Sequence, residues 1–364
     1  MITETGLNAF ISKSPKISLH DHLDGSVRIS TILSHAKELG LALPAESEAG
    51  LENWFQETCS QGTLVEYLKS FEVTAAVMQT QDHLRVVARE YVLDCARDGV
   101  VYAETRWAPL EHSRLGMSPV EAIAAVSEGI AEGVSLSKLD GKEIEVRQIL
   151  TALRHEENSI QVARLALETR DLGVVGFDLA GPELGFPPSI HSKAIAMLQA
   201  ENFPITIHAG EADGPSSVVN AIKDGCAKRI GHGIRIAEDI SWEDGVPELG
   251  SMAKLVRESG VTLEIAPRSN LQTEGSKIFG SSLRDHPFDK LYRAGFAVSV
   301  NPDNRLMSNS SITGELFDLV LTFGYTAGDL HKFQENALER VFCDQATKSK
   351  ISGHLSTFTW NLAG

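Results

Sequence analysis

Paired cysteines and long apolar segments are both missing from this chain of 364 residues. The four cysteines, Cys59, Cys95, Cys226 and Cys343, are far apart and form no CxxC pair. Neither a disulfide framework nor a cysteine zinc site is therefore expected. No run of about 18 apolar residues occurs, and the first residues lack the apolar core of a signal peptide. These absences predict a cytoplasmic protein without a membrane partner.

Positive charge is also scarce, because 33 Lys and Arg residues stand against 49 Asp and Glu residues and give a formal net charge of −16. A chain with this charge repels nucleic acid and anionic membranes, whereas a small neutral substrate is unaffected. Hydrophobic residues make up 42% of the chain, which is enough for a sizeable core. We expect a small-molecule substrate and no nucleic-acid partner; the composition does not indicate an oligomeric state.

Eight short apolar runs, separated by helical patterns, predict strands that are buried on both faces. The runs are Lys16–His22, Val100–Trp107, Val146–His155, Val174–Gly181, Pro204–Glu211, Arg229–Ile234, Thr262–Asn270 and Ala297–Asn304. Eight such units predict an α/β protein with one (β/α)₈ TIM barrel domain over residues 1–364. No GxGxxG turn follows the first run, which disfavours a dinucleotide-binding sheet.

The interval between the first two predicted strands, about 28–98, is longer than the others. It contains helical patterns that include Leu64–Met78 and His83–Arg97. Because this insertion follows a strand on the catalytic face of a barrel, we expect a helical lid there. Pro119–Val134 and Ser159–Thr169 are expected helices of the outer ring.

Ionisable side chains stand at the ends of four predicted strands. Their positions are His20, Asp21 and His22 in strand one, His208 and Glu211 in strand five, His232 in strand six, and Asp303 with Asn304 in strand eight. The carboxyl ends of barrel strands open onto one face, so these groups are expected to meet. Taken alone, His208 is explained as a hydrogen-bonded structural residue and Asp303 as a helix cap. For these residues not to form a shared site, a separate structural explanation would have to hold at all four strand ends.

Three imidazoles and one carboxylate make a suitable zinc site, and here they are His20, His22, His208 and Asp303. A zinc ion would lower the pKa of an attacking water towards about 7. Glu211 follows His208 by three residues and suits a proton donor. His232, between two glycines, could orient or deprotonate the water. We expect one zinc ion per chain.

The set of motifs resembles the adenosine deaminase family of the amidohydrolase superfamily. The matching stretches are HxHLDG at His20–Gly25, YxExR at Tyr102–Arg106, DLAG at Asp178–Gly181, HAGE at His208–Glu211, RxGHG at Arg229–Gly233 and the strand-eight motif at Val300–Asn304. The resemblance implies zinc-dependent hydrolysis of adenosine and 2′-deoxyadenosine to inosine-type products and ammonia, in purine salvage. It also implies that Glu211 protonates purine N1 and that His232 assists attack at C6.

The resemblance further implies which residues bind the nucleoside. Asp24 would bind a ribose hydroxyl, and the Gly181 N–H would contact purine N3. Leu68 and Phe71 resemble the family's apolar gate over the purine, although the same spacing also fits an ordinary amphipathic helix face.

Two positions depart from the family's pattern. Asp21 lies between the two strand-one ligands, where an apolar residue is commoner, and should point away from the metal because it is out of phase with both. Asn304 replaces a usual second aspartate. Its NH₂ group donates at every pH, so we expect it to contact purine N7, with helix capping as the alternative.

Several other functions need motifs that can be looked for in this sequence. A zinc deaminase of cytidine or nucleic acid needs PCxxC, which is absent, and a binuclear amidohydrolase needs a lysine that strand four, VVGFDLAG, lacks. AMP, adenine and aminodeoxyfutalosine remain alternative substrates, although Arg28 is the only basic residue that closely follows HDHLDG. A non-catalytic purine-binding protein on this fold would be expected to have lost Glu211 or a zinc ligand.

Overall fold

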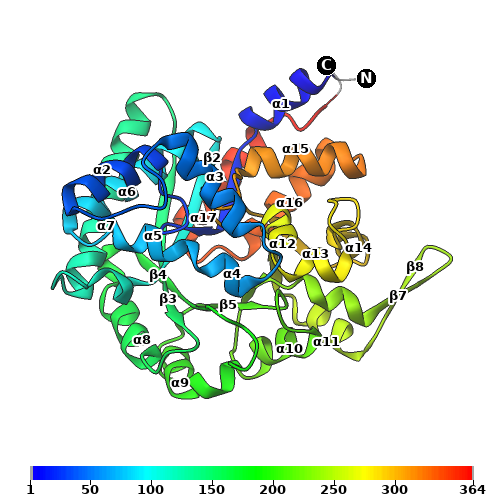
Figure 1. The fold of residues 1–364 in the computed structure, drawn as a ribbon. Helices are drawn as coiled ribbons and strands as arrows, with labels where there is room; N and C mark the ends of the chain where they lie inside the picture. The colour runs from blue at the N-terminus through cyan, green and yellow to red at the C-terminus, as the bar shows by residue number, and fades with distance from the viewer. Residues whose placement is uncertain (1–2, 363–364) are drawn as a thin grey trace.

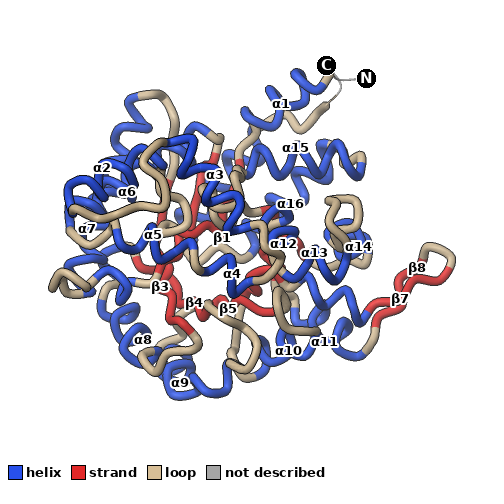
Figure 2. Tube along the Cα trace, viewed as in Figure 1, coloured by secondary structure: helices blue, strands red, loops and turns tan. Residues whose placement is uncertain are grey.

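An eight-stranded parallel sheet forms the centre of the computed structural model, which describes residues 3–362. Its strands, in spatial order, are β1 (Lys16–His22), β2 (Val100–Trp107), β3 (Glu145–Leu153), β4 (Val174–Ala180), β5 (Ile205–Ala209), β6 (Arg229–His232), β9 (Thr262–Ile265) and β10 (Ala297–Val300). Helices surround these strands (Figure 2). The predicted (β/α)₈ TIM barrel is confirmed, although several predicted strands extend too far into the loops that follow them.

The first and last strands meet through a short junction at the mouth of the barrel. An isolated parallel bridge pairs Asp21 with Asp303. The N–H of His22 donates to the Asp303 carbonyl at 2.7 Å, and the N–H of Asp303 donates to the His20 carbonyl at 3.1 Å. Asn301 Oδ1 also accepts the His20 N–H at 3.1 Å. This closure places the residues after β10 directly beside the end of β1.

The outer ring buries the apolar faces of its helices against the strands. Its main helices are α7 (Pro119–Leu139), α8 (Ser159–Glu168), α9 (Ser192–Ala200), α10 (Pro215–Lys223), α11 (Ser251–Ser259), α15 (Ile312–Phe323), α16 (Ala327–Glu339) and α17 (Gln345–Thr357). In α7 a capping box joins Ser118 and Glu121, with proline at the first turn, which explains why the helix starts there. No helix within residues 3–362 is long and apolar enough to cross a membrane.

The insertion after β1 is helical, as predicted. It contains α2 (Ile29–Leu39), α3 (Glu48–Cys59), α4 (Leu64–Leu68), α5 (Ser70–Ala76) and α6 (Gln81–Arg97). The expected helix Leu64–Met78 is divided at Lys69, and α6 packs along α7 in the outer ring. The Tyr67 hydroxyl lies 2.8 Å from Ser308 Oγ, beyond β10. The insertion therefore contacts the loops at the carboxyl ends of the strands.

A hairpin that the sequence analysis did not predict lies between β6 and β9. β7 (Ile240–Glu243) pairs antiparallel with β8 (Val246–Leu249), and the hairpin projects from the body in Figure 1. Its turn residues Asp244 and Gly245 both have positive φ, 49° and 79°, as a two-residue hairpin turn requires. Because the strands are short and half-exposed, their apolar pattern was weak, but the Asp-Gly pair was a usable signal.

The remaining described helices are short or lie at the N-terminal end: α1 (Glu4–Lys13), α12 (Pro267–Gln272), α13 (Glu274–Phe279) and α14 (Phe288–Arg293). α12 begins directly after β9, where the prediction had continued the strand to Asn270. Polar residues at 269 and 270 are thus on a helix at the mouth of the barrel.

Candidate active site

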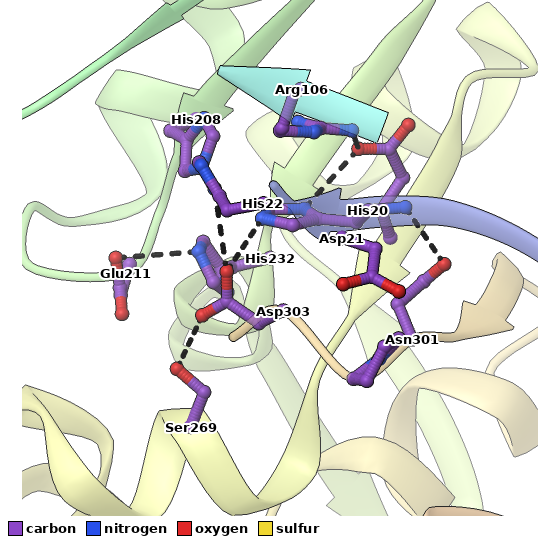
Figure 3. Close-up of polar contacts among 12 residues, drawn as sticks. His20, Asp21, His22, Arg106, His208, Glu211, His232, Ser269, Asn301 and Asp303 are labelled. Atoms are coloured by element: carbon purple, nitrogen blue, oxygen red, sulfur yellow. Dashed lines mark hydrogen bonds and ion pairs between the residues drawn. The ribbon is translucent and has the colours of Figure 1, made fainter. Parts of the chain in front are cut away.

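Four potential metal ligands converge at the mouth of the barrel. His20 and His22 end β1, His208 lies in β5, and Asp303 follows β10. One ligand atom from each lies within 4.8 Å of all the others, and all four residues are buried. Figure 3 shows their side chains pointing toward one another.

The spacing of these atoms fits a zinc ion. His22 Nε2 and His208 Nε2 are 3.2 Å apart, and Asp303 Oδ1 lies 3.1 Å from His20 Nε2 and 3.4 Å from His22 Nε2. Ligand atoms about 2.0–2.1 Å from a tetrahedral zinc ion are about 3.3 Å from one another. His20 Nε2, which faces the centre of this group, forms no hydrogen bond among residues 3–362. A bound cation would coordinate the lone pair of this buried nitrogen.

Two buried carboxylates orient the ligand rings. His20 Nδ1 lies 3.3 Å from Glu264 Oε2, and His208 Nδ1 lies 3.1 Å from Asp178 Oδ1. Metal-binding histidines commonly donate the distal ring N–H to a carboxylate, which fixes the ring and increases its basicity. Both Nε2 atoms are thereby directed to the centre. Glu264 and Asp178 were not identified from the sequence, although each is an acidic residue within an otherwise apolar strand.

The protonation states of the rings suit metal binding. Burial lowers the pKa of His22 to about 3 and also lowers that of His208, so both rings are neutral. For His20, burial and Arg106 disfavour the charged ring, but Asp303 and Glu264 outweigh them and raise its pKa. A metal cation replaces such a proton when it binds, because zinc ligands must be deprotonated.

Glu211 lies beside this centre without belonging to the ligand group. Burial raises its pKa well above the usual value, and the nearby carboxylates of Asp303 and Glu183 raise it further. Its Oε1 accepts the Thr273 hydroxyl at 3.0 Å, and its Oε2 lies 3.4 Å from His232 Nε2. A buried carboxyl that keeps its proton near neutral pH can act as a general acid.

Strained backbone positions occur at this site. His232 and Asp303 have φ values of 64° and 59°, although neither is glycine, and such positions are often found at functional sites. A Cβ at Gly231 would lie 2.9 Å from His20 Cε1. Glycine there therefore allows β6 to lie close to the His20 ring.

Glu183, which the sequence analysis did not single out, fixes the loop that carries Glu211. Its carboxylate accepts four successive backbone N–H groups, from Gly210–Asp213, at 2.6–3.1 Å. The Ser217 hydroxyl donates to it as well, at 2.5 Å. Glu183 is 4% exposed, so these bonds are shielded from water. Its position two residues after the DLAG stretch was the only signal in the sequence.

We expect Glu183→Gln to lower the free energy of unfolding by about 1–3 kcal/mol and to reduce kcat. The substitution keeps the shape but turns an NH₂ group toward backbone donors, so at least one buried N–H loses its acceptor. Chemical denaturation measures the effect. Glu168→Gln, at an exposed position on α8, is the matched control and should change stability by less than about 0.5 kcal/mol. Equal stability of both variants would show that the contacts with Glu183 do not fix the loop.

A cavity of about 490 Å³ opens beside the centre. Among its lining residues are the ligand His22 and four predicted substrate contacts: Asp24, Leu68, Phe71 and Gly181. The Phe71 ring lies 6.0 Å from the His22 ring between centroids. The volume of the cavity falls within the range of small-molecule sites. The structure thus brings these predicted contacts and the metal centre together.

Asn304 is buried but is not among the lining residues of this cavity. It packs on the loop that carries Asp24: a Cβ at Gly25 would lie 1.8 Å from Asn304 Oδ1. Neither Asn304 nor Asp303 caps the following helix, because α15 is capped by Ser311, whose hydroxyl accepts the Gly314 N–H at 3.0 Å. The capping alternative for both residues is therefore wrong.

Asp21 points away from the metal ligands, as its place in the strand predicted. Its Oδ2 accepts Arg305 Nε at 2.8 Å, and its Oδ1 accepts the Ser26 hydroxyl at 3.0 Å. The departure from the family's pattern at this position therefore adds a buried ion pair outside the site.

Residues on or next to α12 contact three site groups. Ser269 Oγ donates to Asp303 Oδ2 at 2.5 Å, Asn270 Nδ2 lies 2.9 Å from His232 Nδ1, and Thr273 Oγ1 donates to Glu211 Oε1 at 3.0 Å. These residues were not predicted as site residues, because the apolar run had placed Ser269 and Asn270 in a strand. Their helical spacing after Pro267 was the available signal.

Comparison with known proteins decides the family. The family model described as adenosine deaminase matches residues 15–358. The chain belongs to the adenosine deaminase family. It is 45% identical over 334 residues to an adenosine deaminase from Mycobacteroides abscessus, covering 91% of each chain. It is 45% identical to adenosine deaminase 1 from Streptomyces coelicolor, covering 91% of this chain and 83% of the relative.

A solved structure agrees with this family assignment. The crystal structure of an Arabidopsis N6-mAMP deaminase superimposes with a TM-score of 0.81 at 28% identity, covering 96% of this chain and 100% of that chain. The resemblance found in the motifs is confirmed for the family and for the fold.

Proposed function

We propose that this chain catalyses the hydrolytic deamination of adenosine and 2′-deoxyadenosine, forming inosine or 2′-deoxyinosine and ammonia. The observation that carries the proposal is Glu211, a buried carboxyl with a raised pKa that lies beside the four-ligand centre without joining it. The adjoining cavity has the size of a small-molecule site. The two curated relatives described above, both named adenosine deaminase, support the same reaction.

The proposed cofactor is one zinc ion per chain, held by His20, His22, His208 and Asp303. When bound, it would make the attacking water acidic enough to supply hydroxide near pH 7. Three imidazoles and one carboxylate are a donor set that zinc prefers. Asp178 and Glu264 would hold the His208 and His20 rings with Nε2 facing the zinc ion.

Glu211 provides the acid that the reaction needs. Its proton passes to purine N1 while water adds to C6, and its carboxylate then receives a proton from the added oxygen. The donated proton remains on N1 of inosine, while one of the two water protons restores the Glu211 carboxyl and the other leaves in ammonia, so the acid is regenerated. The carboxyl must be protonated at the start, which is why burial and the neighbouring carboxylates matter.

The cavity offers a matching set of contacts for the nucleoside. Asp24 Oδ1 is buried and has no hydrogen-bonded partner among the described residues, so it can accept a ribose hydroxyl. Gly181 lies on the cavity wall, where its N–H would meet purine N3, and Leu68 with Phe71 would cover the base.

We expect Asn304→Ala to reduce kcat/KM for adenosine by roughly 5–150-fold, the cost of a buried hydrogen bond of about 1–3 kcal/mol. Purine N7 accepts a hydrogen bond, and the asparagine NH₂ group can donate it without a charge. The test compares adenosine with 7-deazaadenosine, which lacks N7. If wild type and variant discriminate the two substrates equally, Asn304 does not contact N7.

The nucleoside is favoured over a nucleotide by the charges at the cavity. Its two basic lining residues are Lys69 and Arg114. Lys69 Nζ lies 2.6 Å from Glu66, and an Arg114 nitrogen lies 3.6 Å from Glu111. Each cation is paired with a glutamate, which reduces its attraction for a phosphate.

The experiment that tests the substrate is a comparison of kcat/KM, followed by ultraviolet absorbance. The compounds are adenosine, 2′-deoxyadenosine, AMP, adenine and aminodeoxyfutalosine. The nucleosides are expected to exceed the others by at least about 10²-fold, because each missing or unpaired polar contact costs about 1–3 kcal/mol. A higher value for AMP, adenine or aminodeoxyfutalosine would reassign the substrate, and binding without turnover of any compound would indicate a purine-binding protein.

A further inference from the structure

A buried row of side chains extends from His232 away from the metal ligands. Asn270 Nδ2 lies 2.9 Å from His232 Nδ1, and Asn270 Oδ1 lies 3.3 Å from His286 Nε2. His286 Nδ1 in turn accepts the backbone N–H of Phe288, at the start of α14, at 3.1 Å. The three side chains are 0–2% exposed. Water therefore has little access to this row, and its polar atoms must satisfy one another.

The hydrogen bond from the Phe288 N–H determines which atoms of the row donate and which accept. A backbone N–H can only donate, so His286 Nδ1 must accept. Burial lowers the pKa of His286 to about 3, so the ring is neutral and carries one proton. That proton is therefore on Nε2, where it faces Asn270 Oδ1.

The orientation of the Asn270 amide in turn determines the protonation of His232. Its oxygen accepts from His286, so its NH₂ group faces His232 Nδ1 and donates to it. With the amide turned over, NH₂ would face the N–H of His286, and two donors would oppose each other. His232 Nδ1 is thus an acceptor and carries no proton, so the ring proton of His232 lies on Nε2.

We infer that His286 and Asn270 are positioning residues that hold His232 in its Nε2–H form, so that His232 donates a hydrogen bond in the reaction and does not act as its base. Its Nε2 faces the reacting side, 3.4 Å from Glu211 Oε2. The sequence left two roles open for His232, orienting the water or deprotonating it, and this tautomer selects the first. The proton lost by water then goes to the Glu211 carboxylate. The catalytic meaning rests on the proposed function, whereas the tautomer does not.

The direct test is ¹⁵N NMR of the full chain, loaded with zinc and labelled at histidine. Protonated and unprotonated ring nitrogens resonate far apart, and the spectrum of His232→Gln identifies the signals of His232. The expected result is a protonated Nε2 and an unprotonated Nδ1 for both His232 and His286. A protonated Nδ1 on His232 would overturn the inference, whatever the activity of the enzyme.

Variants of the row add a causal test. Asn270→Asp replaces the donor with a group that only accepts, so the proton of His232 should move to Nδ1, and kcat should fall by about 10–100-fold with a smaller change in KM. His286→Gln retains an acceptor and a donor, so His232 should keep its Nε2–H signal. In His286→Leu, His232 should lose this signal. Thermal unfolding shows which variants fold, and the wild-type spectrum tests the inference if none does.

The outcomes separate this inference from the proposed function. If His232 carries the Nε2 proton but the chain deaminates no purine, the proposed function fails and the inference about the His232 tautomer stands. If adenosine is deaminated and Asn270→Asp leaves both the His232 signals and kcat unchanged, the positioning role of Asn270 and His286 is refuted and the proposed function stands.

Discussion

Replacing Glu211 with glutamine is expected to lower kcat by at least about 10²-fold while zinc remains bound, because the variant loses the proton donor and no metal ligand. The glutamine side chain has nearly the same shape and can still accept the Thr273 hydroxyl, which contacts Oε1 at 3.0 Å. Steady-state kinetics with adenosine and elemental analysis of the same preparation measure both effects.

Asp213→Asn is the matched control for Glu211→Gln. Asp213 lies on the same loop, and its Oδ1 accepts the Gly214 N–H at 2.7 Å, a bond that asparagine can keep. This variant also removes one carboxylate from the loop, but we expect kcat to stay close to that of the wild type. If Glu211→Gln loses the metal together with the activity, Glu211 is a metal ligand and the proton donor must be sought elsewhere.

Removing the metal is expected to abolish deamination, and adding one equivalent of zinc per chain should restore it. The reason is that each of the four converging side chains offers one ligand atom, and together they form a single group within 4.8 Å. The measurement titrates chelator-treated protein with zinc and follows adenosine turnover. Unchanged activity in a metal-free preparation, or a need for two equivalents, would contradict the single-zinc proposal.

The barrel and the converging residues could be predicted because they follow from local patterns. Buried parallel strands are continuous apolar runs, and the residue at each carboxyl end must face the mouth. His20, His208 and Asp303 were each placed in this way, without knowledge of any contact. Asp21 could be directed outward because side chains alternate along a strand.

The supporting contacts could not be predicted from local patterns. Glu183 and His286 act through residues far away in the sequence, and only the closed barrel brings them to the loop of Glu211 and to Asn270. Asn270 was placed in a strand because β9 ends earlier than its apolar run suggested. Tertiary packing, which no short window of sequence contains, decides these positions.

The most direct test of the account is mass spectrometry of adenosine incubated with the purified, zinc-loaded protein in ¹⁸O-labelled water. The expected product is inosine that carries one ¹⁸O atom at C6, with one ammonia released for each inosine formed. Unchanged adenosine, or adenine released by cleavage at the sugar, would contradict hydrolytic deamination at this site.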